Sequence, residues 1–217
     1  MKDYADILLL LVTISNLYIV ATSRLTSCVR ASAVQGAALS LLPLVLWAHG
    51  WDVQIFHLAV ICAGTLLIKT IIIPMLVLRA IREANVRREV EPSVSLHSSV
   101  LLAGVLVGVS FWMSSVLVLP KPAPSALLVP AAFATVLTGF LVLVSRKQAI
   151  THVIGYLMIE NGVYIFGQTL ARDVPFAVEL GILLDLLVGI FVMGIAINHI
   201  SREFDHIDTD LLSTLRD

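Results

Sequence analysis

Long apolar runs are the feature of this sequence that most restricts its fold. Seven stretches come close to the roughly 20 apolar residues that a helix needs to cross the hydrocarbon core of a membrane. They cover residues 6–22, 31–48, 56–78, 100–119, 125–144, 150–170 and 176–200. The runs are continuous rather than alternating, which disfavours transmembrane strands. We therefore expect an all-α, polytopic membrane bundle of about seven helices.

Composition agrees with a membrane protein and excludes several other classes. The chain is 59% apolar and 13% charged, whereas soluble domains are nearer 45–50% apolar and about 25% charged. This balance excludes disorder, a secreted disulfide scaffold and an ordinary soluble enzyme. Cys28 and Cys62 stand singly, so we expect no disulfide framework, metal site or cofactor. The first run lacks a small-residue cleavage site and is interpreted as a retained span, not a signal peptide.

The basic residues predict how the chain is oriented in the membrane. Breaks at 49–52, 120–124 and 172–175 and one long loop at 79–99 separate the later runs. Ten basic residues fall on one side and three on the other, which places the N-terminus outside and the C-terminus in the cytoplasm. The ten are Arg24, Arg30, Arg79, Arg82, Arg87, Arg88, Arg146, Lys147, Arg202 and Arg216. We expect a multi-pass protein of the cytoplasmic (inner) membrane.

Four charged residues lie inside the runs, at Lys69, Glu160, Glu179 and Asp185. A charge in the hydrocarbon core costs at least about 2.5–3.5 kcal/mol, so each is a candidate functional residue. At about 1.5 Å per residue, Glu160 and Asp185 both come near the midplane, on consecutive antiparallel runs. Lys69 lies somewhat nearer the cytoplasm, and Glu179 lies one turn inside the outer end of its run. Buried carboxylates with a buried lysine are what proton translocation requires.

Other polar and small residues accompany these charges. Tyr164 follows Glu160 by four residues, and it shares a face with Asn161 and Gln168, a stripe that can hold water. Pro74 is expected to kink the helix and free a carbonyl near Lys69. Two glycine pairs permit close helix packing: Gly155 with Gly162, and Gly104 with Gly108.

Structural alternatives remain open for each charged residue. Glu160 and Asp185 can be neutral and hydrogen-bonded between helices, Lys69 can extend to the cytoplasmic interface, and Glu179 can be an interface residue. His152 and His57 lie near the ends of their runs, where they either serve proton entry and exit or are simply solvated. The sequence has no nucleophile–base pair, phosphate loop or haem-ligating histidines, so chemistry other than ion movement is not indicated.

The last part of the chain, from about 136 to 212, resembles the K-type membrane subunit of respiratory complex I and the C subunit of Mrp antiporters. The resemblance is carried by Arg146-Lys147, Ile154-Gly155, the stretch from Asp185 to Gly189, and Ile207-Asp208. It implies two membrane carboxylates on a proton-conducting axis. Asp185 falls at the second of these positions. Glu160 lies three residues, about one helical turn, beyond the first, where this chain has Leu157.

The whole chain resembles component E of hydrogenase-4, through 68–74 followed by 78–82. We divide it into an N-terminal three-helix segment with its cytoplasmic loop (1–99), a fourth helix with an outer loop (100–124), and a K-subunit-like segment (125–217). The resemblance implies a non-catalytic membrane subunit of an energy-converting [NiFe] hydrogenase or formate hydrogenlyase. Its partners would be antiporter-like and quinone-site-like membrane subunits, with peripheral hydrogenase and iron–sulfur subunits supplying the redox centres; no nucleic acid is expected.

The predicted function is therefore proton (or sodium) translocation coupled to redox chemistry in partner subunits. Glu160 and Asp185 would carry the ion, Lys69 would be a charge partner, Glu179 an outer exit, and Tyr164 and His152 would line the pathway. A structural or assembly subunit, or a subunit of an Mrp-type antiporter, is the alternative. A retinal receptor is disfavoured because the last run has no lysine. An independent transporter is disfavoured because few polar residues lie outside the last two runs.

Overall fold

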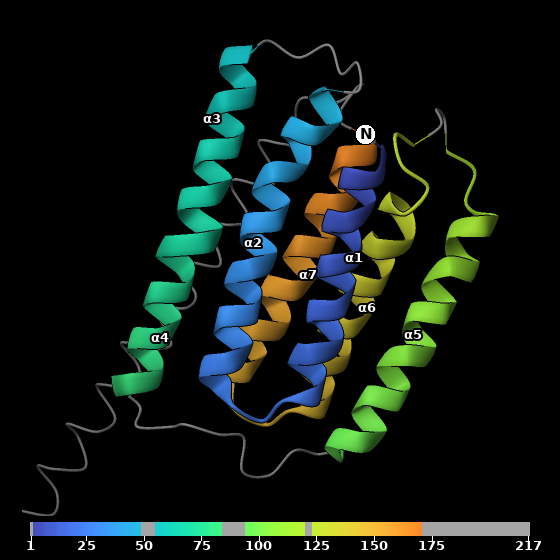
Figure 1. Cartoon of the computed structure of the whole chain (residues 1–217). Helices are drawn as coiled ribbons and strands as arrows, with labels where there is room; N and C mark the ends of the chain where they lie inside the picture. Colours follow the sequence, from blue (N-terminus) through green and yellow to red (C-terminus); the bar gives the residue numbers. More distant parts are fainter. Residues whose placement is uncertain (1, 49–54, 84–93, 120–122, 171–217) are drawn as a thin grey trace, which may run out of the picture.

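The described part of the chain folds into upright helices without strands. The computed structural model describes residues 2–48, 55–83, 94–119 and 123–170. Its elements are α1 (Lys2–Ala21), α2 (Leu25–Trp47), α3 (Ile55–Thr65), the π-helix η1 (Leu66–Ile72), α4 (Ile73–Glu83), α5 (Leu96–Val116), α6 (Leu128–Ser145) and α7 (Ala149–Leu170). Elements α3, η1 and α4 follow one another as a single rod (Figure 1). The predicted run 176–200, with Glu179 and Asp185, lies outside the described residues.

Five of the described helices are long and apolar enough to cross a membrane. They are Tyr4–Ala21, Leu25–Trp47, Leu58–Arg82, Leu96–Val116 and Leu128–Ser145. These helices confirm the first five predicted runs. The sixth run forms α7, which has 22 residues, carries the polar side chains Glu160, Asn161 and Gln168, and is not among these five. Figure 1 shows α7 behind α1 and α2, and it packs against α6 and α2.

The helices do not begin at the first residues of the apolar runs that predicted them: α1 and α5, for example, each begin four residues early, and α2 and α6 show shifts in opposite directions. Helix α2 starts at Leu25, six residues before its run, because helical hydrogen bonding continues through the polar turn that contains Arg30. Helix α6 starts at Leu128, three residues after the start of its run. The Ser125 hydroxyl accepts the backbone N–H of Leu127 at 3.1 Å, and Pro130 falls in the first turn, where no N–H is needed.

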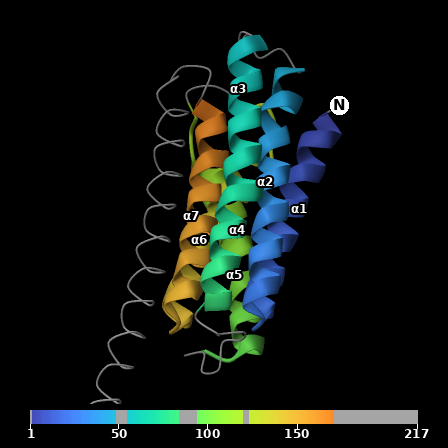
Figure 2. The ribbon, with the colours of Figure 1, turned by 90° about the vertical axis from the view of Figure 1, so that its left-hand side faces the viewer.

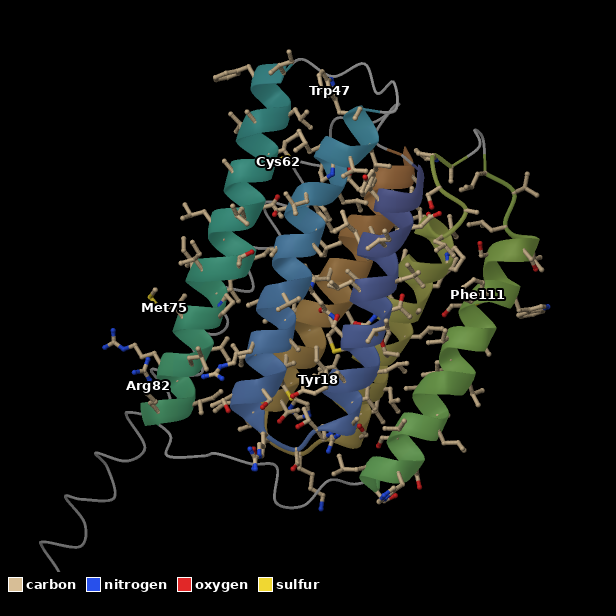
Figure 3. All side chains as sticks on the ribbon, viewed as in Figure 1. Tyr18, Trp47, Cys62, Met75, Arg82 and Phe111 are labelled. Carbon is tan, nitrogen blue, oxygen red and sulfur yellow. The ribbon has the colours of Figure 1, made fainter. Side chains whose placement is uncertain are left out.

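The helices alternate in direction, so the ends predicted to be cytoplasmic lie together. The C-terminal ends of α1, α4 and α6 and the N-terminal ends of α2, α5 and α7 share the lower end of the bundle in Figures 1 and 2. Arg24 and Arg146 follow two of these ends. On α4, Met75 and Arg82 point away from the other helices (Figure 3). Among the described residues, Arg24, Arg82 and Arg146 therefore lie at the end where they were expected; which side of a membrane that end faces stays a prediction.

Two apolar clusters fill the interior, one toward each end. The lower cluster includes Ile19, Leu25, Val77, Val142 and Ile154. The upper cluster includes Leu9, Leu42, Leu46, Leu128 and Ile165. On α1, Val12 belongs to the upper cluster and Ile19 to the lower one, and Asn16 is buried between them. The same order recurs on α2, α6 and α7, so a layer of buried polar side chains crosses the middle of the bundle.

Glycines set how closely α6 and α7 approach. A Cβ on Gly155 would lie 3.1 Å from the carbonyl oxygen of Gly139, and a Cβ on Gly162 would lie 2.8 Å from that of Ala132. The predicted close packing at Gly155 and Gly162 is therefore confirmed. The other predicted pair differs, because a Cβ on Gly104 or Gly108 would meet nothing within 4 Å among the described residues. The α6–α7 contact holds Glu160 at a fixed depth in the layer.

Candidate functional site

An ion pair occupies the middle of the bundle. The ammonium Nζ of Lys69, on η1, lies 2.5 Å from the carboxylate Oε1 of Glu160, on α7. The two side chains are 4% and 2% exposed, so the pair is closed off from the ends of the bundle. Lys69 turns inward to Glu160 rather than extending to an interface. The structure thus brings together two of the predicted site residues, from helices far apart in the sequence.

The backbone at Lys69 is irregular, and its neighbours explain why. The N–H of Ile73 bonds to the carbonyl of Ile68, five residues earlier, which is the π-helical spacing. In that spacing the carbonyl of Lys69 would pair with residue 74, but Pro74 has no N–H to donate. The structure has the π-helix η1 directly before Pro74, where a kink was expected. Bulges of this type often occur at functional sites.

Helix α2 touches the backbone of η1 at this point. A Cβ on Gly36 would lie 2.9 Å from the Cβ, the carbonyl carbon and the carbonyl oxygen of Lys69. Only glycine permits this approach, since a side chain there would push η1 away. The preceding residue, Gln35, is fully buried and so enters the polar layer beside the ion pair. Gly36 therefore sets the depth at which Lys69 and Gln35 lie in the polar layer.

Amide side chains connect the ion pair to α2. The Lys69 ammonium donates to Oδ1 of Asn161 at 3.2 Å. Asn161, next to Glu160 on α7, donates in turn from Nδ2 to Oε1 of Gln35 at 3.2 Å. Asn161 was expected to belong to a water-holding stripe, and the structure places it directly against Lys69 and Gln35.

The connection continues to α1 and α6. Gln35 donates from Nε2 to Oδ1 of Asn16 at 2.7 Å, and Asn16 donates from Nδ2 to the hydroxyl of Thr135 at 2.8 Å. The Thr135 hydroxyl donates to the backbone carbonyl of Ala131 at 2.7 Å. Asn16, Gln35 and Thr135 are each 0% exposed. We call Asn16, Gln35, Thr135 and Asn161 the amide chain; with the ion pair it joins α1, α2, η1, α6 and α7.

Tyr164 and His152 occupy different parts of α7. The ring of Tyr164 lies under the Lys69 ammonium, with its centroid 4.8 Å from Nζ, a distance at which a cation and a ring attract. His152 lies in the first turn of α7, about 12 Å along the helix from Glu160. Its Nε2 donates to the carbonyl of Arg146 at 2.9 Å. Tyr164 is thus part of the site, whereas His152 lies at the start of α7 and bonds to the α6–α7 turn.

Arg146 has a role that counting its charge did not reveal. Its guanidinium is buried, and Nη2 donates to the carbonyl of Val20 in the last turn of α1 at 2.9 Å. The last carbonyls of a helix lack intrahelical partners and carry a partial negative charge. Arg146 therefore binds the end of α1 to the α6–α7 turn.

Sequence reasoning also missed Asn16 and Gln35, because it considered uncharged polar residues only beside the charged ones. The prediction that polar residues outside the last two runs are too few for an independent transporter's substrate site is not tested by these contacts, but Asn16 and Gln35 show that the first two runs do contribute to the polar layer. Uncharged amides in the first two runs were the signal, since each costs free energy in hydrocarbon unless it finds a partner. The structure gives both amides partners across the bundle.

The site joins a buried carboxylate to a buried ammonium. A buried ion pair is held mainly by its hydrogen bonds, because desolvation offsets much of the attraction. Lys69 has Asn161 and the Tyr164 ring as further partners. The second oxygen of Glu160, Oε2, is buried and has no hydrogen-bond donor within the described part of the chain. That oxygen is available to receive a proton. No cluster of three or more potential metal ligands occurs in the described residues.

Fold and site together define a polytopic membrane protein whose central layer holds a buried ion pair in a hydrogen-bonded amide chain. The chain is 33% identical over 205 residues to a protein of Mycobacterium tuberculosis described as "Uncharacterized protein Rv0085", covering 94% of this chain and 92% of that one. It belongs to the same family as that mycobacterial protein.

A more distant similarity extends to a protein that is named as a component of a hydrogenase. Hydrogenase-4 component E of Escherichia coli is 26% identical over 158 residues, which is 71% of each chain. The protein of the same name from Shigella flexneri matches equally well. No protein-family model matches the chain, and no solved structure does. The comparisons therefore support a membrane subunit of a larger complex.

Proposed function

We propose that this protein is a membrane subunit of an energy-converting hydrogenase or formate hydrogenlyase, and that it contributes to proton (or sodium) translocation driven by redox chemistry in partner subunits. The observation that carries the proposal is the Lys69–Glu160 ion pair, buried in the central layer with its atoms 2.5 Å apart. The distant similarity to hydrogenase-4 component E supports the complex and its partners. Those partners would be antiporter-like and quinone-site-like membrane subunits and peripheral hydrogenase and iron–sulfur subunits.

Glu160 is the proposed carrier in the described part of the chain. A proton that arrives at Oε2 neutralises the carboxylate and removes most of its attraction for the Lys69 ammonium. When the proton leaves, the carboxylate regains its charge and the ion pair reforms. Amide side chains neither gain nor lose protons as Glu160 does. The amide chain therefore holds the charges in place and does not conduct protons.

The remaining pathway residues are proposed at the two ends. Asp185 would receive the proton from Glu160, and Glu179 would release it at the outer face; both lie outside the described residues. Tyr164 faces Lys69, and His152 lies at the end where we place cytoplasmic entry. The proposal includes seven spans, an outer N-terminus, a cytoplasmic C-terminus and residence in the inner membrane.

A second function is favoured by the amide chain itself. Side chains from five elements meet in it, so the ion pair and the amides can fix the register of the helices. In that case the protein is a structural or assembly subunit, and the charges exist for specificity rather than transport. A subunit of an Mrp-type antiporter remains the alternative complex.

Two measurements on the intact complex separate these functions. The tagged protein is purified from its own membranes with Glu160→Gln, Asp185→Asn, or Ser110→Ala as a control; Ser110 is buried in α5 and bonds only within its own helix. Redox-driven proton movement is then recorded in vesicles. Translocation predicts intact complexes with less proton movement in the two carboxylate variants. Loss of the complex in those variants favours assembly, and full proton movement in both and in their combination would refute the proposal.

Co-purification also tests the class of complex. Hydrogenase large and small subunits should accompany the tagged protein from detergent-solubilised membranes. Antiporter subunits without a hydrogenase would instead favour the Mrp-type complex. The Ser110→Ala protein should bring down the same subunits as the unaltered protein, which controls for effects of substitution in a span.

A further inference from the structure

The hydrogen bonds of the amide chain all run in one direction, from Lys69 toward Ala131. Lys69 donates to Asn161, and Asn161 donates to Gln35. Gln35 then donates to Asn16, and Asn16 donates to Thr135. Every amide therefore presents its oxygen toward the ammonium and its nitrogen away from it.

The chemistry of the two ends dictates this direction. An ammonium has donors only, so the atom of Asn161 that faces Lys69 must be oxygen. A backbone carbonyl accepts only, so the hydroxyl of Thr135 must donate to Ala131 and accept from Asn16. Rotating any one amide by half a turn would place nitrogen against nitrogen, or oxygen against oxygen. One arrangement satisfies the whole chain.

The direction also has an electrostatic consequence. Each amide dipole points its negative end at Lys69, and these aligned dipoles stabilise a positive charge there in a medium of low dielectric. Hydrogen bonds in series also polarise one another, so the effect of the far end reaches the near end. Gln35, Asn16 and Thr135 can influence Lys69 in this way although three side chains separate Thr135 from the ammonium.

We infer that Asn161, Gln35, Asn16 and Thr135 are positioning residues that act as a directional unit, holding the Lys69 ammonium in place against Glu160. The effect of this unit on ion movement rests on the proposed function, but the existence of the unit does not. The bundle would then contain two kinds of buried polar residue. Members of the unit depend on Lys69, whereas buried hydroxyls outside it do not.

Thr135 and Thr138 provide a matched pair for the test. Both are fully buried on α6 and one helical turn apart. Thr135 accepts from Asn16, whereas within the described residues Thr138 bonds only to the carbonyls of Ala134 and Thr135 in its own helix. Valine replaces either threonine with the same shape and without the hydroxyl.

The experiment compares melting temperatures in detergent for Thr135→Val and Thr138→Val, each in the unaltered protein and in a Lys69→Met/Glu160→Gln background. Changes at distant sites without shared partners are additive. We expect a clearly smaller loss for Thr135→Val in the double background, because the end that fixes the direction is already gone. Thr138→Val should lower the melting temperature by the same amount in both backgrounds. Equal losses for Thr135→Val in the two backgrounds would overturn the inference.

A second measurement does not need the altered background. Nuclear magnetic resonance of the ¹⁵N-labelled protein resolves side-chain NH₂ signals, including that of Asn161. Thr135→Val should shift the Asn161 signal, although Asn16 and Gln35 lie between the two residues, and Thr135→Ser should restore it. Thr138→Val should leave the signal in place. An unmoved Asn161 signal in Thr135→Val would refute the directional unit and leave the proposed function standing, since proton movement in Glu160→Gln tests that function separately.

Discussion

The centre of the bundle and helix α5 are built from similarly apolar segments and yet are used differently. In the most apolar 18 residues of α6, 67% are buried, against 17% in α5. Polar side chains at the centre bond from helix to helix, as Asn16 does to Thr135. In α5, Ser110 and Ser115 bond to carbonyls of their own helix. Apolar content therefore places a helix in the membrane, and interhelical polar groups and glycines determine which helices form the core.

The largest expected difference concerns the ion pair. Lys69→Met leaves Glu160 charged and buried without its partner, and breaking a buried pair in this way costs about 3–5 kcal/mol. Ser110→Ala in α5 should cost less than about 1 kcal/mol, because only a hydrogen bond within one helix is lost. Unfolding in a series of detergent mixtures measures both. Adding Glu160→Gln to Lys69→Met should recover much of the loss; equal costs for Lys69→Met and Ser110→Ala would remove the distinction between the two regions.

A smaller effect should appear at the lower end of the bundle, where Arg146 binds α1. Arg146→Met removes a charged donor from the Val20 carbonyl, an interaction worth about 1.5–3 kcal/mol. Val144→Ala changes a side chain near the same turn that is 79% exposed, and should cost within about 0.5 kcal/mol. The same unfolding assay compares them. If Val144→Ala proved the more damaging change, the proposed link between α1 and the α6–α7 turn would be wrong.

Glycine substitutions give the finest comparison of the two regions. In Gly162→Ala the new Cβ would lie 2.6 Å from Cγ2 of Val136 and 2.8 Å from the carbonyl of Ala132, so α6 and α7 must separate. Overpacking of this kind costs about 1–3 kcal/mol. Gly108→Ala in α5 meets nothing within 4 Å among the described residues and should be neutral or slightly stabilising. The melting temperature of each variant measures the contrast, which disappears if both lose stability equally.

Much of the fold could be predicted from the sequence, because span length and helical periodicity are local properties. The first five runs correspond to helices, and the close approach at Gly155 and Gly162 followed from their spacing. The π-helix could not be anticipated in detail. Pro74 indicated a kink, but the bond from the N–H of Ile73 to the carbonyl of Ile68, which makes the segment π-helical, is not specified by any pattern within the run.

The site could be predicted only in part, because its partners come from distant helices. The depth of Glu160 and Lys69 followed from counting residues along each run, but their contact depends on how η1 and α7 pack. Asn16 and Gln35 were missed because an uncharged amide in an apolar run is a weak local signal. Their importance follows from meeting each other at 2.7 Å, which no pattern within a single run specifies.

Infrared difference spectroscopy of the complex in its membranes tests most directly whether Glu160 takes up and releases a proton. Spectra are recorded with and without turnover on hydrogen or formate, for the unaltered protein, Glu160→Gln and Ser110→Ala. If Glu160 takes up and releases a proton, a carboxylic acid C=O band changes with turnover in the unaltered and Ser110→Ala proteins and is lost in Glu160→Gln. A band that persists in Glu160→Gln, or no such band in the unaltered protein, would contradict it.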